Sequence, residues 1–192
     1  MARPVLQVIV GSTRQQRKGI AVGRWVEQAA REHGGFDVEL VDLAEVALPI
    51  FDEPNHPRLG RYVHQHTKDW SATVSRADAF VVVTPEYNHS FPAAVKNALD
   101  HLFVEWADKP VGLASYGGVS AGQRAATALK PVLTALRMVP VVEGIAVPFF
   151  AQHIDEDGVF RPTDQLAGSA KAMLDELQRL ATALRPLRTG RP

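Results

Sequence analysis

Residues 84–92 carry the side chains of this chain that are best suited to ligand chemistry. They read Thr-Pro-Glu-Tyr-Asn-His-Ser-Phe-Pro and follow an apolar run, 80–83, that predicts a buried strand. A strand that ends in proline and opens into polar residues before a helix places backbone amides and an aromatic ring at the carboxyl edge of a sheet. Ligands of open α/β folds bind at that edge. We therefore expect a ligand site here.

A second polar segment, 11–19, follows the first predicted strand and leads directly into a helix. It carries hydroxyl and amide side chains together with the cations Arg14, Arg17 and Lys18. A helix N-terminus favours a dianionic phosphate, because the helix dipole and the unpaired N–H groups attract anions. The segment lacks the Gly-Lys-Ser/Thr ending of a Walker loop and the spaced glycines of a dinucleotide fingerprint. By itself it fits a phosphate loop and a solvated basic turn equally well.

A third segment, 115–122, reads Ser-Tyr-Gly-Gly-Val-Ser-Ala-Gly and follows a later strand. Its glycines would let a flat ligand approach bare backbone, although ordinary strand-to-helix connections are also often rich in glycine. A phosphate at the first loop and a planar group between the other two is the arrangement of a flavin mononucleotide (FMN) site. The three loops together therefore predict FMN.

His89 and Tyr87 are the candidates for a direct catalytic role. A histidine in such a loop is more often a hydrogen-bonded wall residue or a subunit contact than an acid, so we expect both to be auxiliaries at most. Glu86 and Asp100 could form a carboxylate pair. Asp100, however, is expected on the polar side of its helix, in a helix contact or a subunit salt bridge.

The histidines do not predict a metal site. His64 and His66 are the two that lie close together in sequence. Their spacing of two residues on a predicted helix would point the two rings in different directions. We expect no bound metal.

Strands and helices alternate five times along the chain. Apolar patterns predict strands at 5–10, 36–43, 79–84, 111–116 and 139–147. Core-facing stripes predict helices at about 20–34, 62–77, 92–106, 120–136 and 164–184. Pro131 lies inside the fourth helix and should kink or restart it. Right-handed crossovers between parallel strands then give one three-layer, doubly wound α/β domain over residues 1–184, with 185–192 as a flexible tail.

Composition excludes several classes of protein. The 192 residues include 21 basic and 21 acidic ones, and this balance argues against a nucleic-acid binder and against an acidic electron carrier. The chain has no cysteine, so disulfides, thiolate metal sites and cysteine nucleophiles are excluded. The apolar run before Gly11 is too short for a signal peptide, and no run is long enough to span a membrane. We expect a cytoplasmic protein.

Three segments lie in the order and spacing of a known family: 11–14 with Arg17, 85–92 with 96–100, and 115–118. The loop 48–52, Leu-Pro-Ile-Phe-Asp, matches as well. On these residues the chain resembles the NADPH-dependent FMN reductase family over nearly its whole length. The resemblance implies a flavodoxin-like fold with a five-stranded parallel sheet of order 2-1-3-4-5.

The resemblance also implies which residues bind FMN. The phosphate and the start of the ribityl chain would be held by Ser12, Thr13, Arg14, Arg17, Gly19 and Ile20. The isoalloxazine and ribityl groups would be lined, largely through backbone amides, by Pro85, Glu86, Tyr87 and Asn88. The other side of the ring would be closed by Ser115, Gly117 and Gly118. Two features depart from the family: Ala93-Ala94 after the proline, where glycine is frequent, and Arg17-Lys18, where many members have a serine.

The implied activity is that of an FMN-dependent NAD(P)H oxidoreductase with a quinone, flavin, azo compound or metal oxyanion as acceptor. FMN performs the redox chemistry, so the protein need not supply a general base. The amides of Gly117 and Gly118 are the expected donors to negative charge on the reduced ring. The nicotinamide and the acceptor would occupy the same slot in turn.

Two other functions are compatible with the same fold and the same cofactor. A flavodoxin-like electron carrier is typically acidic and lacks paired arginines in its phosphate loop, whereas a redox sensor would hold FMN without rapid turnover. Similar proteins are homodimers or homotetramers with the flavin near a subunit boundary, so we expect the same here. The expected interface residues are Phe91, Trp106, Phe149 and Phe150, with the core as the alternative place for Trp106. Apart from a small-molecule acceptor, we expect neither a nucleic-acid nor a membrane partner.

Overall fold

The computed structural model describes residues 3–189. One five-stranded sheet runs through it, with the order β2-β1-β3-β4-β5 and every neighbouring pair parallel. The strands are β1 (Val5–Val10), β2 (Asp37–Asp42), β3 (Ala79–Pro85), β4 (Pro110–Tyr116) and β5 (Val139–Val147). The predicted doubly wound α/β fold and its strand order are confirmed.

The helices connect and cover these strands. They are α1 (Gly19–His33), α2 (Leu43–Val46), α3 (Gln65–Ser75), α4 (Ala93–Asp100), α5 (Gln123–Ala135) and α6 (Asp164–Thr189). Two 3₁₀ turns, η1 (Pro57–Leu59) and η2 (Phe150–His153), lie in the connections after α2 and β5. Among the helices of residues 3–189, none combines the length and apolarity that a membrane crossing needs.

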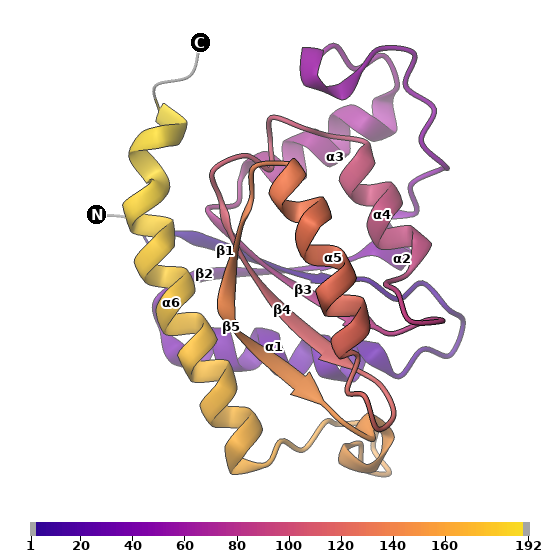
Figure 1. The fold of residues 1–192 in the computed structure, drawn as a ribbon, viewed down its shortest axis with the longest axis vertical. Helices are drawn as coiled ribbons and strands as arrows, with labels where there is room; N and C mark the ends of the chain where they lie inside the picture. The colour runs from indigo at the N-terminus through magenta and orange to yellow at the C-terminus, as the bar shows by residue number, and fades with distance from the viewer. Residues whose placement is uncertain (1–2, 190–192) are drawn as a thin grey trace.

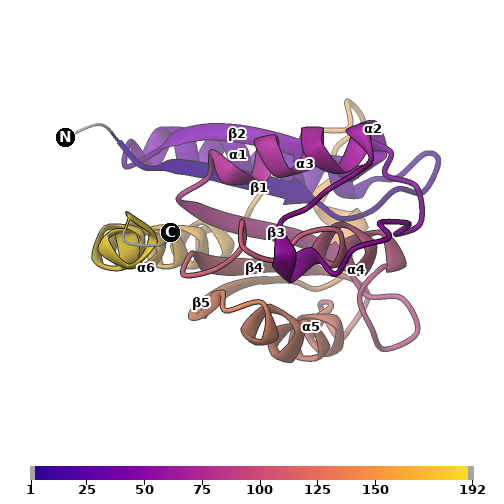
Figure 2. The same cartoon turned by 90° about the horizontal axis from the view of Figure 1, so that it is seen from above.

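Side chains of the central strands alternate between two apolar cores. Val81 and Val83 of β3 belong to the core under α1 and α6. Phe80 and Val82 belong to the core under α3, α4 and α5. Successive residues of a strand face opposite sides, so a continuously apolar strand contributes to both cores. Figures 1 and 2 show the resulting layers, with α6 and α5 on opposite sides of the sheet.

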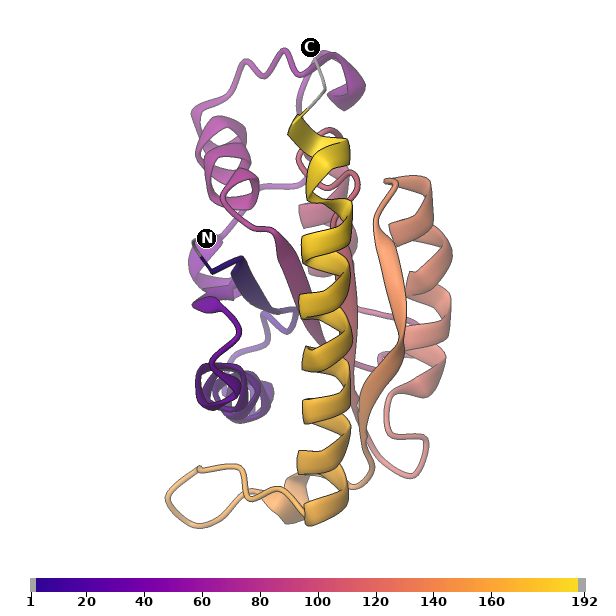
Figure 3. The same cartoon turned by 90° about the vertical axis from the view of Figure 1, so that its left-hand side faces the viewer.

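Helix α6 is longer than the predicted range 164–184. It runs along most of the length of the domain (Figure 3), and residues 185–189 are helical, which corrects the expected flexible tail over that range. Arg188 explains the extension, because its guanidinium pairs with the carboxylate of Asp78 at 2.5 Å. The rest of the predicted tail, 190–192, lies outside the described residues.

Helix α4 is shorter than the predicted range 92–106. It ends at Asp100 because buried side chains take the carbonyl oxygens of its last turn. The donors are Trp70 Nε1 to Ala98 at 2.9 Å, Trp106 Nε1 to Leu99 at 3.2 Å, and His101 Nδ1 to Asn97 at 2.8 Å. Trp106 is 1% exposed, so of the two places expected for it, core and interface, it lies in the core.

Helix α5 continues through Pro131, where a kink or a restart was expected. Proline removes one helical hydrogen bond and crowds the preceding turn. Here the ring of Pro131 is exposed, while Leu129 and Leu133 on the opposite side of the helix are fully buried. Packing of these leucines on the sheet offsets the loss of one backbone hydrogen bond.

Candidate active site

Three loops meet at the carboxyl edge of the sheet and enclose a hollow of about 430 Å³. They follow β1, β3 and β4 and gather at the right and lower right of Figure 1, with η2 on one side. The lining residues are Ser12, Arg14, Gln15, Gln16, Arg17, Lys18, Gly19, Pro85, Glu86, Tyr87, Tyr116, Gly117, Gly118 and Phe150. Most of the predicted flavin residues are among them.

Four of the predicted flavin residues do not line the hollow. Thr13 and Ile20 face two smaller hollows on either side of the first loop. Asn88 is exposed at the tip of its loop. Ser115 is buried, and its hydroxyl donates to the Ala121 carbonyl at 2.9 Å, away from the hollow.

Five lining residues were not among the predicted binding residues: Gln15, Gln16, Lys18, Tyr116 and Phe150. Tyr116 could have been found by strand alternation, because Ser115 and Tyr116 must face opposite sides of the sheet. Phe150 was expected at a subunit interface. Its place beside the hollow depends on η2, which no sequence pattern predicts.

The first loop packs closely against the end of β4. Gly19, where α1 begins, lies so close to Tyr116 that a Cβ atom at position 19 would be 1.8 Å from the tyrosine oxygen. Burial raises the pKa of Tyr116, so its hydroxyl stays protonated and able to donate at the N-terminus of α1. Ser12 Oγ lies 2.9 Å from the Tyr87 hydroxyl, and the Arg14 guanidinium lies 6.0 Å from the centre of the Tyr87 ring.

Arg17 is paired within the protein rather than free for a phosphate. Its guanidinium contacts the Asp42 carboxylate, which is 6% exposed. Asp42 also accepts a hydrogen bond from the Ala44 N–H at 3.0 Å and thereby caps α2, a helix that the sequence pattern did not predict. The cations of the first loop that extend freely beside the hollow are therefore Arg14 and Lys18.

The loop after β3 closes on itself in a tight turn. Tyr87 and Ser90 exchange two backbone hydrogen bonds of 2.8 and 2.9 Å. Asn88 and His89 between them have φ values of 48° and 67°, the left-handed conformation that such a two-residue turn requires. The Tyr87 N–H is used in the turn, so among the backbone amides of 85–88 expected to contact the flavin, this one is engaged within the loop. His89 is exposed at the tip.

Glu86 joins this loop to α5. Its carboxylate pairs with Arg124 at 2.5 Å and accepts hydrogen bonds from the Arg124 N–H and the Ser120 hydroxyl, both at 3.2 Å. The Arg124 guanidinium holds the pKa of Glu86 below its ordinary value. Asp100 is not its partner, since Asp100 pairs with Lys96 at 2.6 Å on its own helix, which confirms the expected helix contact.

The two glycines after β4 differ in what their N–H groups can do. The Gly117 N–H donates to the Val147 carbonyl at 3.2 Å, so it is not available to a ligand as predicted. The carbonyls of Gly117 and Gly118 accept from Phe150 and Phe149. The Gly118 N–H has no hydrogen bond within residues 3–189, and no atom approaches the position of its missing Cβ within 4 Å. Gly118 is therefore the open backbone donor at this edge.

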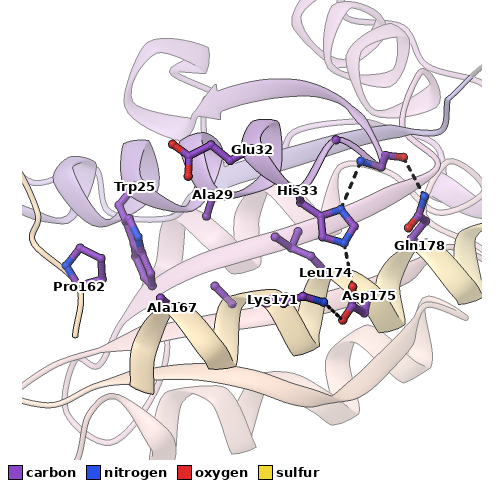
Figure 4. A pocket seen from close by; sticks show the side chains of 13 residues that line it. Trp25, Ala29, Glu32, His33, Pro162, Ala167, Lys171, Leu174, Asp175 and Gln178 are labelled. Carbon is purple, nitrogen blue, oxygen red and sulfur yellow. Dashed lines mark hydrogen bonds and ion pairs between the residues drawn. The ribbon is translucent and has the colours of Figure 1, made fainter. Parts of the chain in front are cut away.

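A larger hollow lies elsewhere, between α1 and α6 (Figure 4), with a volume of about 710 Å³. Its polar groups already pair with one another: His33 Nε2 lies 3.0 Å from Asp175, and Lys171 lies 2.7 Å from the same carboxylate. Helix α1 leaves the carboxyl edge at Gly19, so its far end at His33 lies toward the opposite edge. None of the predicted flavin residues lines this hollow.

The histidines after β2 do not lie as predicted. His64 precedes α3 and is not part of it, and its ring stacks on that of His66 with centroids 5.2 Å apart and planes at 10°. The expectation that the two rings point apart is wrong, because it assumed that both residues are helical.

Comparison with known proteins identifies the family. Residues 5–152 match the model of the NADPH-dependent FMN reductase family. This chain belongs to that family. An NAD(P)H-dependent FMN reductase of Schizosaccharomyces pombe is 41% identical over 149 residues, which span 76% of this chain and 74% of the relative. The FMN reductase resemblance stated from the sequence is confirmed.

One further relative and one solved structure are similar to this FMN reductase. An FMN-dependent NADPH-azoreductase of Staphylococcus saprophyticus is 31% identical over 158 residues, covering 82% of this chain and 79% of the relative. The flavoenzyme NAD(P)H:acceptor oxidoreductase of Paracoccus denitrificans superposes with a TM-score of 0.73 at 21% identity, covering 94% and 98% of the two chains. The structural match supports the flavodoxin-like fold. Together with the family, the curated relatives confirm the predicted class of FMN-dependent NAD(P)H oxidoreductase.

Proposed function

We propose that this FMN reductase holds FMN in the hollow between the three loops and oxidises NAD(P)H there for a small-molecule acceptor. The observation that carries the proposal is the composition of the hollow. Cations without an ion pair in the described part of the chain lie at the N-terminus of α1, aromatic side chains line the hollow, and the Gly118 backbone is accessible to a ligand. These are the groups that a phosphate, a flat ring and a ring carbonyl require.

The residues of the hollow fit FMN in distinct ways. Arg14 and Lys18 would hold the phosphate, together with the protonated hydroxyl of Tyr116 and the N-terminal amides of α1. Arg17 would act through Asp42, since their ion pair fixes the first loop against β2 and α2. Because that loop is already tied down, FMN would bind without first ordering it.

FMN supplies the acceptance of a hydride from the nicotinamide and the onward transfer of electrons. The protein's own part is binding, orientation and charge stabilisation. Tyr87 and Phe150 would flank the slot, and the Gly118 N–H would donate to negative charge on the flavin ring. Glu86 is engaged by Arg124, so it would hold the loop in position rather than move a proton.

The acceptor would be a flat molecule that fits the slot once the nicotinamide has left. Quinones, free flavins and azo compounds have that shape, and the azoreductase relative favours the azo class. Metal oxyanions are a further candidate acceptor. The alternative is a flavodoxin-like carrier or a redox sensor, which would bind FMN and turn over slowly with every acceptor.

The experiment that tests the proposal is a visible spectrum of the purified protein with FMN, followed by NADPH without oxygen. We expect bound flavin that bleaches within seconds and recovers when a quinone or azo dye is added. Flavin that binds and stays oxidised would favour the carrier or sensor. Absence of flavin binding would overturn the site itself.

Arg14→Ala should weaken FMN binding about tenfold, because it removes a charge-assisted contact to the phosphate. The measurement is the quenching of FMN fluorescence on titration with protein. Arg24→Ala is the matched control, since Arg24 lies on α1 and lines the neighbouring hollow instead. Equal affinities for FMN in the wild type and the Arg14 variant would remove Arg14 from the phosphate site.

The assembly and the compartment stay predictions. We propose a homodimer or homotetramer with Phe91, Phe149 and Phe150 near the boundary; Phe149 is 49% exposed. Light scattering of the flavin-loaded protein checks it, and a mass equal to one chain would contradict it. A cytoplasmic location without nucleic-acid or membrane partners is likewise still a prediction.

A further inference from the structure

A second cluster of polar side chains lies outside the flavin hollow. Asp52, His66 and His101 each offer one ligand atom, and these atoms lie within 4.8 Å of one another. They come from three separate segments: the loop after α2, the first turn of α3 and the end of α4. Nothing in the proposed flavin chemistry uses them.

His101 is the side chain that points to a ligand. It is completely buried, and its Nδ1 must donate to the Asn97 carbonyl at 2.8 Å, because a carbonyl oxygen only accepts. In the neutral ring Nε2 then carries the lone pair, and this atom has no hydrogen-bond partner within residues 3–189. A buried polar atom without a partner is costly in a protein interior. A ring held by Nδ1–H···O=C with Nε2 left free is also the usual form of a metal-binding histidine.

Asp52 and His66 complete the cluster. His66 Nε2 lies 3.0 Å from Asp52 Oδ1. His64 stacks on His66 and places its own Nε2 4.0 Å from the other carboxylate oxygen of Asp52. The Asp52 side chain is 43% exposed, so solvent reaches one side of the cluster.

The segments that carry these side chains are fixed by other contacts. Glu53 is buried and accepts from the N–H groups of Val63 and His64 at 2.8 and 3.0 Å, which holds the start of α3. Asn97 accepts from the Phe51 N–H at 2.8 Å and donates to the Pro49 carbonyl at 2.7 Å, which holds the loop against α4. The segments that carry the ligands are therefore already in place, and a cation would require only adjustment of side chains.

We propose that Asp52, His66 and His101 bind a divalent transition metal ion of the zinc class. Two imidazoles and one carboxylate form the nitrogen–oxygen donor set that Zn²⁺ prefers, with a fourth position left for water on the exposed side. Bonds of about 2.1 Å in a tetrahedral site place ligand atoms roughly 3.4 Å apart. Asp52 and His66, 3.0 Å apart, are already close to this distance, and with all three ligand atoms within 4.8 Å of one another, rotation of the partly exposed Asp52 and His66 side chains would let an ion reach His101 as well. The ion would join the loop after α2 to α3 and α4.

The test is calorimetric titration of the flavin-loaded, untagged protein with Zn²⁺ at neutral pH. We expect one ion to bind per chain. Asp52→Asn and His66→Gln should each weaken binding at least about tenfold, since each removes a ligand. Both side chains are partly exposed, so both variants should fold.

The matched control is Asp175→Asn, which removes an exposed carboxylate from a His–Asp pair that has no third ligand. Unchanged Zn²⁺ affinity in this variant, with weakened affinity in the other two, supports the site. The proposal is overturned by the absence of saturable binding in the wild type. It is also overturned if Asp52→Asn and His66→Gln bind as tightly as the wild type.

Discussion

Gly19 and Tyr116 show how single side chains shape the flavin hollow. The tyrosine hydroxyl occupies the space where any other residue at position 19 would place its Cβ. The absence of a side chain at Gly19 lets the first turn of α1 approach β4. The amides of that turn then lie beside Arg14 and Lys18, where a phosphate can use all of these groups.

Gly19→Ala should lower the free energy of unfolding by about 1–3 kcal/mol and weaken FMN binding, because the new methyl group overlaps Tyr116. Thermal unfolding and FMN titration measure the two effects. Adding Tyr116→Phe removes the oxygen at 1.8 Å but leaves the ring carbon at 2.5 Å, so it should restore only part of the loss. Gly168→Ala is the control, since its Cβ meets no atom within 4 Å on the exposed side of α6. A Gly19→Ala protein with wild-type unfolding and FMN affinity would contradict this packing.

At the scale of an element, the loop between β3 and α4 is a self-contained turn anchored at its base. The paired hydrogen bonds between Tyr87 and Ser90 form it, and the Glu86–Arg124 pair attaches it to α5. Left-handed backbone at two successive non-glycine residues costs free energy. The turn persists because both of its ends are held.

His89→Gly should raise the free energy of unfolding by up to about 1 kcal/mol, because glycine adopts a φ of 67° without strain. FMN affinity and kcat should stay at their wild-type values if His89 serves only the turn. His89→Gln is the matched variant, which removes the imidazole and keeps the strain. A fall of kcat in both variants would instead assign the imidazole a part in turnover.

At the scale of the whole molecule, the amino edge of the sheet carries buried charged side chains. Lys109 is 6% exposed and donates to the carbonyls of Val74 and Ser75 at 3.0 and 3.4 Å. Burial lowers the pKa of Lys109 from 10.5 to about 8, and the positive charge of the nearby Arg188 adds to this effect. This edge ties α6 to α3 and β4, while the opposite edge holds the ligand loops.

Lys109 should make the stability of the protein depend on pH. Between pH 8 and 10.5 the unfolded chain binds a proton at this lysine that the folded chain does not, so stability from this group rises with pH across that window. Below pH 8 Lys109 is charged in the folded chain as well, so burial of this charge lowers the free energy of unfolding by its full amount. The difference in unfolding free energy between the wild type and Lys109→Met should move in favour of the wild type by on the order of 2 kcal/mol from pH 8 to pH 10. Denaturant unfolding at both pH values measures it, and a constant difference would contradict the assignment.

The sequence by itself determined the strands and the loops that meet at the ligand edge, and the family resemblance of its motifs supplied the strand order. Short, continuous apolar runs rich in β-branched residues, such as 79–84, favour central strands between two layers, and parallel strands with right-handed crossovers bring the loops after β1, β3 and β4 to one edge. The sequence also placed the cations of residues 11–19 at the start of α1, where binding of a phosphate stays a prediction. These features depend on local chemistry, which the sequence states directly.

Only the tertiary structure decided which groups of those loops are free to bind. Arg17 is taken by Asp42, Glu86 by Arg124 and the Gly117 N–H by Val147, partners that lie 25 to 38 residues away along the chain. The grouping of Asp52, His66 and His101 likewise arises from three segments. Periodicity fixes the face of an element on which a side chain lies. Its partner depends on which distant segments pack together, and that is decided by burial of the core as a whole.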